Sequence, residues 1–309
     1  MPDAAGPLRR RTEAIRAMAL GAVFLAVAAC GPEVESAVQR GDRLLAAGEV
    51  DAAIAEYKLA LRQEGPEPAI LLRLGRAHAR SGDVDEVLRH LSPLLAEDSA
   101  WAVPVAAELS EAARVAREEG SPENMARALG PVLDLGPGFV PRDLRLPLAR
   151  QYASVNDWGR AVPLYLAAEE AGDLEGEAVL ELARAFQELG GCRAALPYFE
   201  RYLAQAGRRE RTGAMWQYGA CLYEVAMADR VQGRRAESIE RLDVLIEQGI
   251  PRTLLDRAHY ARGEMHLETG DTEAAERDFL AVLELNPVRS GPLVRLAEER
   301  IREIRFGVR

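Results

Sequence analysis

Two stretches of the sequence, 34 residues apart, carry the same pattern of small, apolar and turn-forming residues. Residues 41–60 read GDRLLAAGEVDAAIAEYKLA, and residues 75–94 read GRAHARSGDVDEVLRHLSPL. In both, a second glycine follows the first after seven residues, and apolar residues recur at helical spacing around it. A glycine between two such segments ends one helix and lets another begin. The pattern therefore predicts a helix–turn–helix unit that repeats.

The same phase continues along most of the chain. Small and aromatic residues recur in it at Ala149, Tyr152, Ala161, Tyr165 and Ala168, then at Ala183, Phe186, Gly190, Ala195 and Phe199, and finally at Gly263, Gly270, Ala275, Phe279 and Pro287. This pattern resembles the tetratricopeptide repeat, a helix–turn–helix unit of 34 residues. The resemblance implies an all-α, right-handed superhelical solenoid of about seven repeats at 34–67, 68–101, 106–139, 142–175, 176–209, 212–252 and 256–289. A non-repeating helical bundle is the alternative, which the recurring interval disfavours.

Two features near the end of the chain depart from the plain repeat. The sixth unit has Gly219 at the small eighth position, but its turn glycine, Gly233, comes seven residues late. Seven residues make about two helical turns, so its first helix should be longer. The expected solenoid covers 35–290, and an amphipathic helix within 291–309 should cap it, because the last repeat of a stack has no neighbour to cover its apolar face.

The first residues have the character of an export and anchoring signal. A basic segment, 9–11, precedes an uncharged run, 17–29, which is shorter than the about 20 residues that span a bilayer. The run ends in Val27-Ala28-Ala29-Cys30-Gly31, which resembles the bacterial lipobox. The resemblance implies a signal peptide over 1–29, acylation of Cys30 and a lipidated tether over 30–34. An ordinary signal peptide with an incidental cysteine and an uncleaved anchor are the alternatives.

Composition and the lipobox resemblance together suggest a location. Lysine and arginine number 39 against 49 aspartates and glutamates, for a net charge of −10. Nucleic acid is therefore not expected as a partner, since its binding needs a basic surface. Membrane contact is expected through the N-terminal lipid alone. Gly31 stands where an aspartate would favour inner-membrane retention in the proteobacterial pattern, so we expect an outer-membrane anchor facing the periplasm.

The sequence shows no constellation typical of an enzyme. It lacks a Gly-rich phosphate loop, HExxH and GxSxG, so no catalytic residue, cofactor or small-molecule substrate is expected. His259 and His266 could share a helix face but have no clear third ligand, so no metal is expected either. Cys192 and Cys221 fall on helices that should pack together. They could form a disulfide in an oxidising compartment or remain two buried thiols.

The first helices of the units are the candidate binding surface, because in the resembled family they line the concave groove. The ninth position carries arginine in four consecutive units, at Arg76, Arg114, Arg150 and Arg184. Aromatic residues follow in later units, at Trp216, Tyr223 and Tyr260. Planar guanidinium groups suit carboxylates, and aromatics beside arginine are typical of binding hot spots. Alternatively, the arginines form solvated ion pairs with acids on neighbouring turns.

These observations lead to a functional expectation. The chain should be a non-enzymatic, lipid-anchored periplasmic scaffold that holds an envelope protein or peptide, with an acidic segment in its groove. Its role would lie in outer-membrane or envelope complex assembly. The alternative is a regulator or activator of a peptidoglycan synthase or hydrolase.

Overall fold

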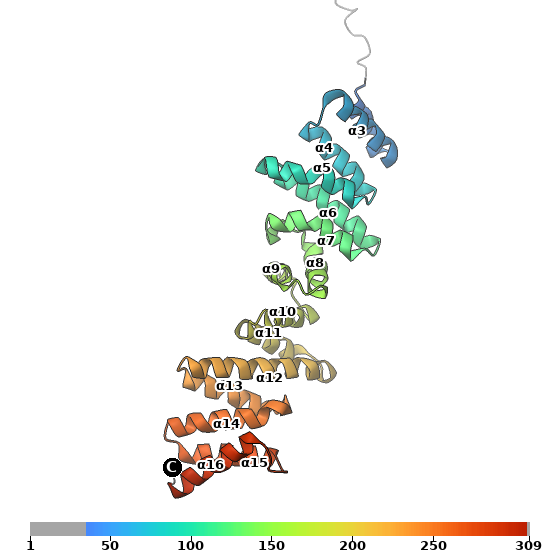
Figure 1. Cartoon of the computed structure of the whole chain (residues 1–309). Coiled ribbons are helices and arrows are strands. Elements are labelled where there is room, and N and C mark those ends of the chain that lie inside the picture. Colours follow the sequence, from blue (N-terminus) through green and yellow to red (C-terminus); the bar gives the residue numbers. More distant parts are fainter. Residues whose placement is uncertain (1–34, 308–309) are drawn as a thin grey trace, which may run out of the picture. The chain divides into compact units, whose positions relative to one another are not determined.

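The structure, a computed structural model, describes residues 35–307. These residues form fifteen α-helices and two short 3-10 helices, with no strand among them, which confirms the all-α prediction (Figure 1). The helices belong to two compact units that divide between residues 94 and 95. The predicted signal peptide, Cys30 and the tether lie outside the described residues.

Consecutive helices pair into hairpins, one for each predicted repeat. Unit 1 contains α2 (Ala37–Ala46), α3 (Val50–Glu64), α4 (Pro68–Arg80) and most of α5 (Val84–Glu97). Unit 2 contains η1 (Ser99–Trp101), α6 (Ala102–Glu118), α7 (Pro122–Asp134), η2 (Pro137–Phe139), α8 (Arg142–Ser154), α9 (Trp158–Glu170), α10 (Glu177–Glu188), α11 (Cys192–Gln205), α12 (Arg208–Val231), α13 (Arg235–Gln248), α14 (Arg252–Glu268), α15 (Thr272–Leu285) and α16 (Pro292–Phe306).

Some first helices begin before the predicted start of their repeat. The first helices α6, α12 and α14 begin at residues 102, 208 and 252. Each start lies four residues before the expected start of its unit, at 106, 212 and 256. At α12 the reason is a side-chain cap, in which the Glu210 carboxylate accepts a hydrogen bond from the Gly207 backbone N–H at 3.0 Å. With 24 residues, α12 is the long helix that the late Gly233 predicts.

The turns inside the hairpins have the predicted chemistry. A glycine with φ between +72° and +85° follows the first helix in six of the described hairpins, at Gly48, Gly82, Gly120, Gly190, Gly233 and Gly270. In the remaining one Asn156 takes this conformation, with φ +60°. The carboxylates of Asp83, Asp157 and Asp271 then cap the second helix by accepting a backbone N–H three residues later.

Close helix crossings explain why small residues recur at the eighth position. A Cβ at Gly41 would lie 2.5 Å from a ring carbon of Tyr57, and one at Gly75 would lie 2.5 Å from a methyl carbon of Leu91. Both large side chains are fully buried. The missing Cβ therefore leaves room for a large core residue from the second helix of the same hairpin.

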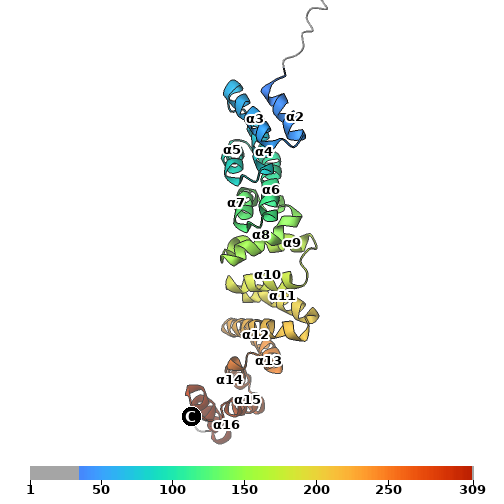
Figure 2. The same cartoon turned by 90° about the vertical axis from the view of Figure 1, so that its right-hand side faces the viewer.

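In unit 2 the hairpins pack on one another in chain order (Figure 2), through the pairs α7–α8, α9–α10, α11–α12 and α13–α14. The terminal helix α16 covers the last hairpin, because Val294, Ala297 and Ile301 are buried against Phe279 and Val282 of α15. This packing gives α16 the position of the expected cap. Among the described residues, no helix combines the length and the apolar character that crossing a bilayer requires.

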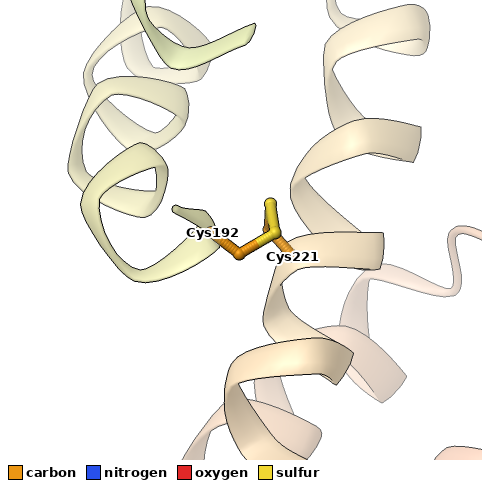
Figure 3. The surroundings of a disulfide bond; sticks show 2 residues. All are labelled: Cys192 and Cys221. Atoms are coloured by element: carbon orange, nitrogen blue, oxygen red, sulfur yellow. A yellow bond between two sulfur atoms is a disulfide. The ribbon is translucent and has the colours of Figure 1, made fainter. Parts of the chain in front are cut away.

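A disulfide joins the fifth and sixth repeats (Figure 3). It links Cys192, the first residue of α11, to Cys221 within α12, with the Cα atoms 4.9 Å apart. Both side chains are buried. Of the two arrangements that the sequence leaves open, the structure therefore contains the bonded one.

Candidate functional site

The predicted ladder arginines of unit 2 connect the first helices of successive repeats. Arg114 on α6 donates from Nε and Nη2 to the two carboxylate oxygens of Asp143 on α8, at 3.1 and 3.3 Å. Arg150 on α8 donates from Nε to both carboxylate oxygens of Glu181 on α10, at 3.0 and 2.9 Å. Each guanidinium thus reaches an acid one repeat along the stack. The alternative interpretation expects partners on neighbouring turns instead, as in the additional pair of Arg114 with Glu111 at 3.4 Å.

Arg184 also bridges two successive first helices, but its acceptor is a side-chain amide instead of a carboxylate. Arg184 on α10 donates from Nε to the Gln217 side-chain oxygen on α12 at 3.0 Å, and its Nη1 lies 3.6 Å from Glu177. Other first helices are joined in the same way by Arg73–Asp42 (α4 to α2) and Arg230–Glu268 (α12 to α14). Arg300–Glu264 joins the cap helix α16 to the last first helix, α14. We call these contacts the first-helix bridges.

Two of the bridges lower the pKa of their acids. Hydrogen bonds from Arg114 keep the pKa of Asp143 below its ordinary value, and hydrogen bonds from Arg235 and Arg230 do the same for the pKa of Glu268. Both pairs are therefore ionic at neutral pH. Because their side chains are partly exposed, we assign these pairs mainly to orientation of the guanidinium groups rather than to stability.

Unit 1 has a hollow between its two first helices, where the predicted site residue Arg76 lies. The hollow has a volume of about 410 Å³. It is lined by Asp42, Leu45, Ala46, Tyr57, Leu72, Arg73, Arg76 and Arg80. Arg73 is bridged to Asp42, and Arg80 donates to the Leu45 carbonyl at 3.0 Å. Three arginines against one aspartate make the hollow locally positive on a chain of net charge −10.

Unit 2 has a second hollow of the same type, with a volume of about 530 Å³. It is lined by Arg117, Arg142, Asp143, Leu146, Pro147, Arg150 and Asp173. Arg117 donates to the backbone carbonyl of Asp143 at 3.1 Å, and Arg142 donates to the Asp173 carboxylate at 2.7 Å. Three arginines against two aspartates again leave a positive balance among the lining residues, and Leu146 and Pro147 add apolar lining.

Of the three predicted aromatic anchors, one has an exposed side chain. Trp216 on α12 is 55% exposed. Tyr260 instead packs against Phe279, with ring centroids 5.5 Å apart, as part of the last core cluster. Tyr223 is half-buried, and loss of solvent raises its pKa. Only Trp216 therefore offers an exposed apolar face of the kind that anchors a partner.

The histidines weighed as metal ligands share a carboxylate. His259 Nδ1 lies 2.8 Å from Asp278 Oδ1, and Arg262 donates to both oxygens of the same group at 2.9 and 2.6 Å. His266 Nε2 is 3.9 Å from Asp278. Burial by itself would raise the pKa of Asp278, but hydrogen bonds from His259 and Arg262 hold it below the ordinary value. This cluster is an internal ion network of the last repeat.

The acceptors of the bridges are the residues that sequence reasoning missed. Glu181 and Gln217 follow their arginines by 31 and 33 residues, about one repeat. Both occupy the sixth position of the next unit. A search for an oxygen-bearing side chain one repeat after each arginine would have found them.

Comparisons with known proteins identify the repeat. Family models of the tetratricopeptide repeat match residues 44–104 and 226–290. No curated protein matches the sequence.

Several solved structures are similar. One is a tetratricopeptide repeat protein from Parabacteroides merdae, with 16% identity, 87% of this chain and 97% of that chain covered, and a TM-score of 0.34. Another is YrrB, described as a TPR protein with an unusual peptide-binding site, with 19% identity, coverage of 68% and 97%, and a TM-score of 0.35. A third is the C-terminal part of a TPR repeat-containing protein from Cytophaga hutchinsonii, with 12% identity, coverage of 84% and 98%, and a TM-score of 0.38.

The repeat family generally provides non-enzymatic surfaces for protein binding. The hairpins of the described residues, their turn chemistry and the two family matches agree on one assignment. The chain is a tetratricopeptide repeat protein.

Proposed function

We propose that this protein is a scaffold that binds an acidic polypeptide segment of a partner on its first helices. The observation that carries the proposal is the pair of arginine-lined hollows, one in each unit, between neighbouring first helices. Both are positive on balance although the chain is acidic. A segment that carries carboxylates matches this local charge.

The bridges support such binding because they orient the guanidinium groups in advance. A guanidinium has five N–H donors, more than the single carboxylate of its bridge accepts, so a partner carboxylate can add without displacing the acid already present. Arg150 illustrates this, since its hydrogen bonds to Glu181 both come from Nε. A side chain that is already held in place loses less conformational entropy when the partner binds.

Trp216 supplies the apolar contact of the proposed surface. It lies on the same helix as Gln217, which ends the bridge from Arg184. More than half of the Trp216 surface is exposed, so a partner can reach the indole. An exposed indole next to a first-helix bridge is a favourable binding anchor.

Replacement of Arg117 and Arg150 by glutamine should weaken acidic-peptide binding roughly tenfold, because partly exposed charge-assisted hydrogen bonds contribute only about 0.5–1 kcal/mol each after solvent screening. Glutamine keeps an N–H donor near the position of Nε for Glu181 and removes the charge together with the Nη donors that would face the partner. The probe is a fluorescein-labelled peptide of glutamate, serine and leucine, titrated with protein and followed by fluorescence anisotropy. Added salt should weaken binding to the unchanged protein.

The matched control replaces two exposed arginines of second helices, Arg62 on α3 and Arg277 on α15, by glutamine. Net charge then changes equally, so binding should stay within twofold of the unchanged protein. Equal losses in both variants, or tighter binding of a lysine-rich peptide, would refute the proposed surface.

We also propose that the scaffold is anchored in the cell envelope through lipid on Cys30, with an envelope protein as partner. The support is the order of basic, apolar and lipobox residues at the start of the sequence. The disulfide is consistent with it, since such bonds persist in oxidising compartments.

Cys30→Ser should move the protein from the membrane fraction to the soluble fraction and abolish incorporation of radiolabelled palmitate. Gly31→Ala, which keeps the thiol, is the control and should leave both unchanged. Membrane sedimentation of the Cys30→Ser protein after a high-salt wash would contradict the anchor.

A further inference from the structure

Two histidines and a glutamate meet in the second hairpin, within unit 1. His78 comes from α4, and Glu86 and His90 lie one turn apart on α5. One ring nitrogen of each histidine and one carboxylate oxygen of Glu86 all lie within 4.8 Å of one another. His90 Nε2 is 3.3 Å from Glu86 Oε2, and the two imidazole rings stack with centroids 5.9 Å apart.

His78 is unusual because packing does not require a polar ring there. It is 4% exposed, and neither of its ring nitrogens has a hydrogen-bond partner. Most of the other repeats have apolar residues at this position, namely Leu44, Ala116, Tyr152, Phe186 and Leu222. In the last repeat the equivalent His266 faces the Asp278 carboxylate. Buried polar atoms without partners are uncommon in native proteins and call for an explanation.

We propose that His78, Glu86 and His90 bind one divalent transition-metal ion of the zinc class. Two imidazoles and a carboxylate are an established zinc ligand set, and three protein ligands leave a fourth position for water or another donor. Metal bonds of about 2.0–2.2 Å would hold the ligand atoms about 3.4 Å apart, so the distances between them, now at most 4.8 Å, need to shorten by no more than about 1.4 Å. The metal would also satisfy the buried imidazole of His78.

The surroundings suit this role. Burial lowers the pKa of both histidines, so the rings are neutral and can ligate at neutral pH. Asp83 Oδ2 lies 3.8 Å from His78 Nδ1, where a small rotation would let it accept the Nδ1 proton when Nε2 binds the ion. Lys58 and Arg89 oppose the added charge, but both are exposed. Arg89 pairs with Glu86 Oε1, which leaves Oε2, the oxygen that lies beside His90, for the ion.

The consequence is a metal clamp between α4 and α5. The site links the two helices of one hairpin through side chains, so a bound ion should stabilise that repeat. The expectation of no metal considered only His259 and His266, which share a helix. The ligands proposed here come from two helices of a hairpin, where the fold rather than the local sequence brings them together.

The test uses the full-length protein after removal of metal with EDTA. Titration with Co²⁺ should give the intense visible absorption bands of tetrahedral coordination at one ion per chain, and Zn²⁺ should displace them. Zn²⁺ should also raise the thermal unfolding midpoint. His90→Gln and His78→Phe should each lower Zn²⁺ affinity by about a hundredfold or more, since even residues that only support a ligand change affinity by 10- to 100-fold.

His78→Phe separates the metal role from packing, because phenylalanine occupies the matching position in α10 and should keep the helical circular dichroism spectrum. His259→Gln is the control and should bind Co²⁺ as the unchanged protein does. Absence of tetrahedral Co²⁺ bands in the unchanged protein would overturn the proposal. Unchanged Zn²⁺ affinity in a folded His90→Gln protein would overturn it as well, whether or not His78→Phe folds.

Discussion

Removal of the Cys192–Cys221 disulfide should lower the free energy of unfolding by about 3–4 kcal/mol, because the bond closes a loop of considerable length in the unfolded chain. The bonded residues are 29 apart in sequence. The bond also ties α11 to α12, the contact between the fifth and sixth repeats. In a stack of repeats each interface contributes to cooperativity, so loosening this one should weaken the coupling of the repeats on either side. Urea unfolding of a Cys192→Ala/Cys221→Ala protein, followed by circular dichroism, measures the effect.

Dithiothreitol provides the control for this prediction. It should destabilise the unchanged protein by a similar amount and leave the double alanine variant unaffected. An unchanged urea midpoint after complete reduction, verified by thiol titration, would show that the bond is not important for stability.

Gly219→Ala should destabilise the sixth repeat by about 1–3 kcal/mol, the usual cost of forcing extra atoms into a packed site. A Cβ on Gly219 would lie 2.2 Å from the Ile250 carbonyl oxygen and 2.6 Å from Pro251 Cδ. The nearest atom belongs to the backbone, so no rotamer change can relieve the contact. The thermal unfolding midpoint, measured by circular dichroism, should fall clearly.

Gly213→Ala on the same helix is the matched control. A Cβ there would have no neighbour within 4 Å, so alanine should stabilise α12 by about 0.5–1 kcal/mol through its better helix propensity. The two substitutions are chemically identical, but their effects on stability should have opposite signs. Equal effects would mean that helix propensity alone governs both sites and that the crossing at Gly219 is loose.

The sequence predicts the repeats well because packing between neighbouring helices restricts residue type. A large core residue such as Tyr57 needs a glycine opposite it, as at Gly41, and this pair recurs one repeat later as Gly75 and Leu91. The lengthened α12 follows from the same logic, since the late Gly233 fixes where the helix ends. Helix starts are less regular, because local capping groups such as Glu210 decide them.

The candidate site is harder to predict. The repeat spacing places Arg114, Arg150 and Arg184 on successive first helices, but the sequence leaves open whether they face a partner or an acid of the same chain. That choice depends on acceptors about a repeat away, such as Glu181, and on side-chain conformation. Clusters that cross a hairpin, such as His78 with His90, are missed for a related reason. Their members have no recognisable short spacing.

The central claim is that an acidic segment binds to the arginines of the first helices. It is tested most directly by NMR of the guanidinium Nε–H and indole N–H groups in ¹⁵N-labelled protein, with assignments from single Arg→Gln and Trp→Phe variants. Addition of the glutamate-rich peptide should shift the signals of Arg117, Arg150 and Trp216. The signals of Arg62 and Arg277 on second helices should stay in place. Shifts confined to those second-helix arginines, or no shift at saturating peptide, would contradict the claim.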